Sequence, residues 1–262
     1  MKTLKILEKS KTFWYILGLL LLFFILRLPS LIEPNWYGDE GIYQVIGLAI
    51  SKGRLLYSQI WDNKPPLLYI TYAIFHGDQF QVRLFSMFSG LLATVTFFQL
   101  TQLLFKQLKA SVISTLFFVV IFATPIIEGN IANAENFMLL LTITAGILIY
   151  KHSINTRYLI LNTKYLILVE VGLLLGIAFL FKIVAVFDLG AFLVYFIIAS
   201  TKELRIRNQK LWPCREQIIS LLPNYLFIIL GFIIPITITA LYFLFNHAFL
   251  DFSRAVFFSN VS

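Results

Sequence analysis

Apolar runs of about 20 residues recur along most of this chain, and each is long enough to cross a bilayer as an α-helix. Of the 262 residues, 59% are hydrophobic, 27 are Phe and only 13% are charged, whereas soluble domains carry about 25% charged residues. A water-soluble globular domain could not bury so much apolar surface, and a disordered chain needs the opposite composition. We therefore predict an all-α, polytopic transmembrane helical bundle.

The hydropathy pattern predicts seven spans with an inside N-terminus and an outside C-terminus. They are 13–32, 83–105, 111–127, 136–151, 164–182, 184–200 and 219–246. Lysines precede the first span and no small-residue cleavage site follows it, so we expect a retained helix and not a signal peptide. With this topology most Lys and Arg residues fall in short cytoplasmic segments, as the positive-inside rule requires.

The first outer loop, 33–82, is the longest polar segment and is rich in Trp, Tyr, Asp and Gly. Within it, the apolar stretch 66–76 is half the length of a span, so we expect an amphipathic helix along the membrane surface. The net charge of +8 fits basic cytoplasmic loops and does not require nucleic acid. A single cysteine, Cys214, excludes an intramolecular disulfide and a Cys-rich zinc site.

Two motifs in this loop carry groups suited to chemistry. The first, WYGDEGIY, contains the adjacent carboxylates of Asp39 and Glu40, followed by Tyr43. These acids could instead only cap the next helix or complement its dipole. The second motif, WDNKPPL, holds Asn63 and Lys64 before two prolines that stiffen the chain. Lys64 could meet a lipid phosphate there, or Trp and Lys could simply anchor the loop at the interface.

Two further motifs lie between predicted spans. NIANAEN places Glu135 among three amides in a short outer loop, which could also be no more than a polar helix start. Lys182 and Asp188 lie where two spans nearly join, and Glu170 lies in the preceding run. Charges within apolar runs are costly and tend to be functional, although a Lys side chain can also reach the interface along its own stem.

In order along the chain, WYGDEGIY, WDNKPPLLY, VRLFSMFSGLL, ANAENFMLLLT and LGIAFLFKIVAVFD resemble the integral-membrane GT-C glycosyltransferases. The resemblance is nearest to bacterial relatives of protein O-mannosyltransferases and of lipid A aminoarabinose transferases. It implies a GT-C-like fold in which Asp39 is catalytic, with Glu40 beside it and Glu135 as the acid of the second outer loop. It also implies phosphate binding by Lys64 and Lys182, and we assign Asn63 and Tyr43 to substrate binding.

The resemblance further implies the partners and the location of the protein. The donor would be a polyprenyl-phosphate sugar, and the acceptor a hydroxyl of a lipid, glycan or protein, at the outer face of the inner membrane. The carboxylates allow Mg²⁺ or Mn²⁺ without requiring either. Family members are about twice as long, so we expect 1–262 to be one transmembrane module truncated at its C-terminus, with 33–82 as the catalytic loop.

Two other functions remain open at this point. A transporter or flippase could line a path with Lys182, Asp188 and Glu170, although no inverted repeat of broken helices is visible. A non-catalytic membrane partner is the other alternative. Sugar transfer that depends on substrate would separate an enzyme from both.

Overall fold

The chain is all-α in the part that the structure, a computed structural model, describes: residues 2–34, 37–155, 161–208 and 215–259. Side chains are described for 11–34, 37–153, 165–199 and 222–259. The α-helices are α1 (Lys2–Arg27), α2 (Gly38–Ser51), α3 (Pro66–Ile74), α4 (Gln79–Phe105), α5 (Leu108–Ala123), α6 (Ala134–Asn155), α7 (Leu161–Phe181), α8 (Ala185–Asn208), α9 (Arg215–Phe245) and α10 (Phe249–Ser253). The short helices η1 (Pro29–Leu31), η2 (Pro125–Ile127) and η3 (Arg254–Phe258) complete the order.

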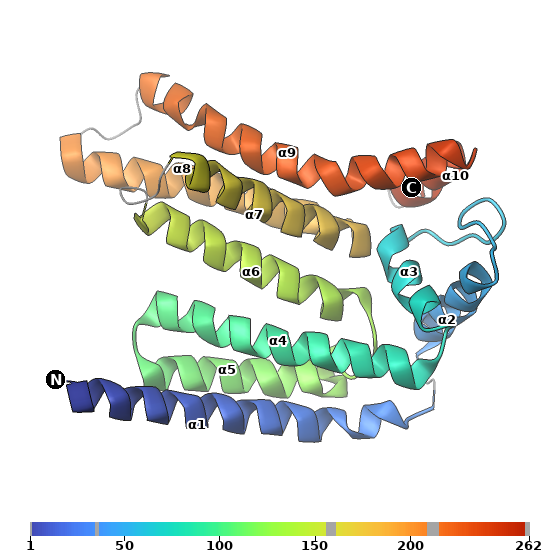
Figure 1. Ribbon diagram of the computed structural model, residues 1–262, viewed down its shortest axis with the longest axis horizontal. Coiled ribbons are helices and arrows are strands. Elements are labelled where there is room, and N and C mark those ends of the chain that lie inside the picture. Colours follow the sequence, from blue (N-terminus) through green and yellow to red (C-terminus); the bar gives the residue numbers. More distant parts are fainter. Residues whose placement is uncertain (1, 35–36, 156–160, 209–214, 260–262) are drawn as a thin grey trace. The chain divides into compact units, whose positions relative to one another are not determined.

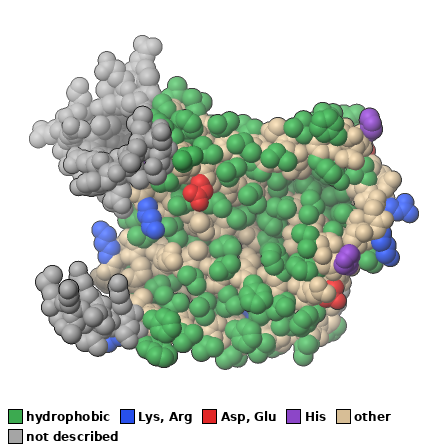
Figure 2. Space-filling model, viewed as in Figure 1, with side chains coloured by type: hydrophobic (Ala, Val, Ile, Leu, Met, Phe, Trp, Pro, Cys, Tyr) green, Lys and Arg blue, Asp and Glu red, His purple; other side chains and the backbone are tan. Residues whose placement is uncertain are grey.

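Several of these helices have the length and composition of membrane spans. Within the described residues, three are long and apolar enough to cross a bilayer: Gln79–Phe105, Ala134–Ser153 and Leu222–Phe245. Three shorter apolar helices are Leu108–Ala123, Tyr165–Phe181 and Ala185–Ala199. Hydrophobic side chains cover most of the face shown in Figure 2, where charged ones are sparse. The all-α class is confirmed, and the count of seven spans stays a prediction.

The first of two compact units comprises residues 1–60 and 66–143. In it α1, α4 and α5 pack side by side, and α2 packs on α3 (Figure 1). The core between the three long helices consists of buried side chains from each of them: Leu19, Phe23, Met87, Phe98, Val119 and Ala123. Gly90 lets α4 approach α1, because a Cβ there would lie 2.3 Å from Cζ of Phe23.

The second unit comprises residues 61–65 and 144–262. Its main contact joins α7 to α9, with α8 against α7 and α10 against α9. A Cβ on Gly172 would lie 2.0 Å from the carbonyl oxygen of Ile228, and one on Gly231 would lie 2.2 Å from that of Val169. Small residues of this kind let two helices of a membrane protein pack backbone against backbone.

Most helix ends lie within about five residues of the predicted spans, but α1 begins eleven residues before the predicted start at 13, and α8 ends eight residues after the predicted end at 200. The first span was predicted to reach residue 32, but α1 ends at Arg27 and the chain tightens into η1. Pro29 explains the difference, because it has no N–H to continue the α-helical ladder. The predicted break near Lys182 is present, since α7 ends at Phe181 and α8 begins at Ala185. The segment predicted as a surface helix forms α3.

Candidate active site

The N-terminus of α2 carries the two acids of the first motif. The N-cap is Tyr37, whose side chain makes no capping hydrogen bond, so the alternative in which Asp39 caps the helix is wrong. Asp39 and Glu40 lie instead in the first turn, where the helix dipole favours negative charge. Consecutive helical residues point in different directions, and the two carboxylates have different environments.

Glu40 forms a buried ion pair with Arg83 of α4. The two side chains are 1% and 0% exposed, and the Nε atom of Arg83 donates to Oε1 of Glu40 at 2.8 Å while Nη2 donates to Oε2. Nη1 of Arg83 donates to the carbonyl oxygens of Ser30 at 2.6 Å and Glu33 at 2.7 Å. The backbone N–H of Ala132 adds a 3.3 Å hydrogen bond to Oε1 of Glu40. This network joins η1 and the segment after it, the start of α2, α4 and the α5–α6 loop.

Asp39 is half-buried and is held by a tyrosine one turn further along α2. The hydroxyl of Tyr43 donates to Oδ2 of Asp39 at 3.0 Å. Tyr43 is 1% exposed and makes edge contacts with the rings of Tyr69 and Tyr72 of α3, at 6.0 and 5.7 Å between centroids. Burial, followed by the charge of Asp39, raises the pKa of Tyr43 above its ordinary value. Tyr43 therefore stays protonated and orients Asp39, which is a positioning role.

Three carboxylates act electrostatically on the hydroxyl of Tyr37. Burial, then the charge of Asp39, then that of Glu128, raises the pKa of Tyr37 to about 12, and Glu135 contributes as well. The Tyr37 hydroxyl also hydrogen-bonds the Glu128 carboxylate. The start of α2, the α5–α6 loop and the first turn of α6 thus bring their acids to one place in the first unit.

Buried groups fix the α5–α6 loop, which carries Glu128 and leads into the first turn of α6 with Glu135. Arg27, 1% exposed at the end of α1, donates to the carbonyl oxygen of Gly129 and, at 3.1 Å, to Oγ of Ser86. The hydroxyl of Tyr72 donates to the carbonyl oxygen of Ala132 at 2.9 Å. Hydrogen bonds to otherwise buried carbonyls give the loop one conformation, since breaking them leaves polar groups unsatisfied.

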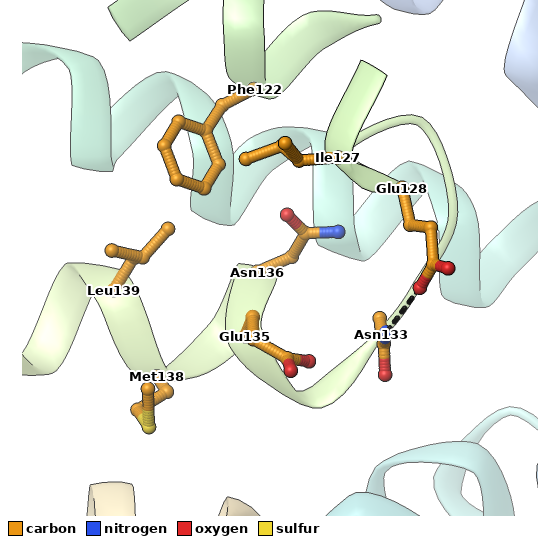
Figure 3. A pocket seen from close by; sticks show the side chains of 8 residues that line it. All are labelled: Phe122, Ile127, Glu128, Asn133, Glu135, Asn136, Met138 and Leu139. Atoms are coloured by element: carbon orange, nitrogen blue, oxygen red, sulfur yellow. Dashed lines mark hydrogen bonds between the residues drawn. The ribbon is translucent and has the colours of Figure 1, made fainter. Parts of the chain in front are cut away.

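A cavity of about 270 Å³ lies at the same loop. Its lining comes from α5, η2, the loop and α6: Phe122, Ile127, Glu128, Asn133, Glu135, Asn136, Met138 and Leu139. Figure 3 shows the apolar side chains of Phe122, Met138 and Leu139 on one side and Glu128 with Asn133 on the other. Nδ2 of Asn133 donates to Oε2 of Glu128 at 3.3 Å.

The acids of this site do not form a ready-made cation site. Among the residues whose placement is described, no three His, Cys, Asp or Glu side chains come together closely enough to hold a metal ion. Bivalent cations such as Mg²⁺ need several oxygen ligands in fixed geometry.

The basic candidates lie in the second unit. Lys64 is half-buried in the 61–65 segment, and Pro65 and Pro66 lead directly into α3. Its neighbour Asn63 donates its backbone N–H to Oδ1 of Asp62 at 2.7 Å. Lys182 follows the last residue of α7 and is also half-buried.

The structure thus brings Asp39, Glu40, Tyr43 and Glu135 together in one unit, and it places Asn63, Lys64 and Lys182 in the other. Trp36 of the first motif and Cys214 lie outside the described residues, as do most of the basic side chains assigned to cytoplasmic segments.

Sequence reasoning assigned no role to Arg83, Arg27, Tyr37 or Glu128. The signal for the two arginines was present, because each is a charge in or beside a long apolar run.

Comparison with known protein families supports the reading of the motifs. Residues 64–226, more than half of the chain, match the model of the dolichyl-phosphate-mannose-protein mannosyltransferase family. The chain belongs to this family. No curated protein and no solved structure matches it.

Membership makes the chain a membrane glycosyltransferase of the mannosyltransferase-like, GT-C type. The matched residues include Lys64, Glu135 and Lys182. They begin after Asp39, Glu40 and Tyr43, so the case for those three depends on their geometry and on the resemblance of their motif.

Proposed function

We propose that this protein transfers a sugar from a polyprenyl-phosphate donor to a hydroxyl acceptor at the outer face of the inner membrane, with inversion at the anomeric carbon. The family name supports a lipid-phosphate donor. The apolar helices support a location within the membrane, where such a donor resides. In the predicted topology, the acid-bearing segments of the site are on the outer side.

The observation that carries this proposal is the 3.0 Å hydrogen bond by which the buried Tyr43 hydroxyl holds the Asp39 carboxylate. The charges of Asp39, Glu128 and Glu135 all act on Tyr37. Asp39 is the general base: it accepts the proton of the acceptor hydroxyl as the oxygen attacks. A positioned base of this kind contributes about 10²–10⁴-fold to the rate.

The proposed sugar transfer is a single displacement at the anomeric carbon, in which one bond forms as another breaks. The acceptor oxygen forms a bond to the anomeric carbon while the bond from that carbon to the phosphate oxygen breaks. The phosphate leaves with the bonding electron pair as polyprenyl phosphate, and the acceptor proton ends on Asp39. The anomeric carbon has oxocarbenium character in the transition state, and attack on the face opposite the phosphate inverts its configuration.

Lys64 is proposed to bind the phosphate, with support from Lys182 and Asn63. A fixed cation stabilises the charge that the departing phosphate acquires. The two prolines after Lys64 limit the conformations of its backbone. Glu135 is proposed to orient hydroxyls of the substrates, and Glu40 is proposed to act through Arg83 by holding the start of α2 in place.

Native mass spectrometry of the detergent-purified protein with polyprenyl-phosphate mannose tests donor binding. We expect an adduct of the donor mass that weakens in Lys64→Ala. Lys52→Ala is the matched control, because Lys52 is an exposed lysine at the end of α2. An adduct that is absent, or that Lys64→Ala and Lys52→Ala affect equally, would contradict the proposed donor site.

A further inference from the structure

The cavity at the α5–α6 loop has two chemically different walls. One wall consists of carbon and sulfur: Phe122, Ile127, Met138 and Leu139. The other consists of carboxylates and amides: Glu128, Asn133, Glu135 and Asn136. A free sugar or a polar peptide would leave the carbon-and-sulfur wall in contact with water. A pure hydrocarbon would bury the carboxylates of the other wall without hydrogen-bonding partners. The lining therefore fits a molecule with one polar and one apolar end.

The polar wall adjoins the proposed base. Glu128 and Glu135 of this wall and Asp39 all act on the hydroxyl of Tyr37, which hydrogen-bonds Glu128. Glu128 has a φ of 59°, a left-handed conformation that a non-glycine residue adopts at some cost and that concentrates at functional sites. A hydroxyl bound between Glu135 and Asn133 would lie at the wall whose carboxylates, together with Asp39, act on the hydroxyl of Tyr37.

The apolar wall adjoins surface of membrane character. Beside the cavity, the η2 residues Ile126 and Ile127 are 69% and 48% exposed. On α5, whose Phe122 lines the cavity, Phe117 is 65% exposed. Exposed apolar side chains at these positions suit a helix end in contact with lipid, where a hydrocarbon chain can enter the cavity sideways without crossing water.

The size of the cavity limits what it can hold. Since water takes up about 30 Å³ per molecule in the liquid, 270 Å³ corresponds to roughly nine waters. Pockets that enclose a whole drug-sized ligand usually begin at about 300 Å³. The cavity therefore accommodates the hydroxyl-bearing head and the first carbons of a lipid, and the rest of the chain must remain in the bilayer.

We propose that this cavity is the acceptor subsite and that the acceptor is a membrane lipid with a hydroxylated head, not a protein or a soluble glycan. The inference rests on the proposed function and deepens it. The head hydroxyl is hydrogen-bonded by Glu135 and Asn133, and the adjoining carbons pack on Phe122, Met138 and Leu139.

An acceptor series tests this assignment with the full chain in lipid nanodiscs and polyprenyl-phosphate mannose labelled in the sugar. Glycerol and monoacylglycerols of increasing acyl length serve as acceptors, and a Ser/Thr peptide serves as the protein alternative. We expect kcat/KM to rise by up to about fourfold per added methylene, the value for full burial of a CH₂. The rise should stop once the chain extends beyond the cavity.

A pair of leucine variants locates the effect. Leu139→Ala, in the cavity wall, should lower kcat/KM for monoacylglycerols by about tenfold, because it removes apolar side-chain area that is about half-buried, and it should lower transfer to glycerol much less. Leu116→Ala is the matched control, since Leu116 is a 40% exposed leucine of α5 outside the lining. The loss should appear mainly in KM for the monoacylglycerols. A general structural defect would instead lower transfer to every acceptor equally.

The outcomes separate this inference from the function on which it rests. Transfer that is equal for glycerol, lipids and peptide, or equal in the two leucine variants, would overturn the lipid-acceptor subsite and leave the glycosyltransferase intact. Preferred transfer to the peptide would overturn it as well. If no acceptor receives sugar and the donor is not consumed, the proposed function fails together with this inference.

Discussion

Removing Arg83 should destabilise the protein strongly, and a second substitution should restore much of the loss. In Arg83→Met, the Glu40 carboxylate would remain 1% exposed and keep only the 3.3 Å hydrogen bond from Ala132. Breaking a buried ion pair from one side costs about 3–5 kcal/mol, because the remaining charge is not compensated. Adding Glu40→Gln removes that charge while it retains the shape of the side chain, so we expect the double variant to regain at least about 2 kcal/mol.

The free energy of unfolding can be measured by SDS titration of the protein in mixed micelles. Arg54→Met is the matched control, because Arg54 is exposed, and surface substitutions usually change stability by less than about 0.5 kcal/mol. A loss in Arg83→Met no larger than in the control would contradict the network. An additional loss on introducing Glu40→Gln would show that the carboxylate is not the source of the cost.

Three further predictions concern the candidate site and the helix packing. Tyr43→Phe should lower sugar transfer about 10-fold, equivalent to about 1.4 kcal/mol, without loss of folded protein, because Asp39 loses its orienting hydrogen bond; steady-state kinetics and size-exclusion chromatography together measure this. The folded-state pKa of Tyr37, about 12, lies above its ordinary value of 10.0, so its contribution to stability is complete below pH 10 and is lost as pH rises towards 12; thermal unfolding of Tyr37→Phe should show a smaller alkaline loss than the wild type. Gly172→Ala should cost about 1–3 kcal/mol by forcing α7 from α9, whereas Gly190→Ala, which has nothing within 4 Å, should be close to neutral in the same assay.

The helices of this protein are largely predictable from sequence because long apolar runs leave the backbone few alternatives in a bilayer. Even the break at Lys182 was visible, since a charge interrupts an otherwise continuous apolar stretch. The early end of α1 depended on Pro29, whose effect hydropathy does not register. Hydropathy finds the apolar runs, and the ends depend on local backbone chemistry.

The candidate site was predictable only in part. Asp39 and Glu135 stood out because acids in short outer segments are conspicuous in such an apolar chain. The partners of Glu40 were not predictable, because Arg83 lies 43 residues away on another helix and no local spacing relates the two. Glu128 and Tyr37 were overlooked for the same reason: their association depends on how the α5–α6 loop folds onto the start of α2.

Sugar transfer by Asp39→Asn tests the central claim most directly. Asparagine has nearly the same shape and can still accept the hydrogen bond from Tyr43, but it cannot take the acceptor proton. With polyprenyl-phosphate mannose and a hydroxyl acceptor, we expect kcat to fall by about 10²–10⁴-fold, while folding and donor binding match those of the wild type. Near-full activity in Asp39→Asn would contradict the assignment and would reduce Asp39 to a charge at the start of a helix.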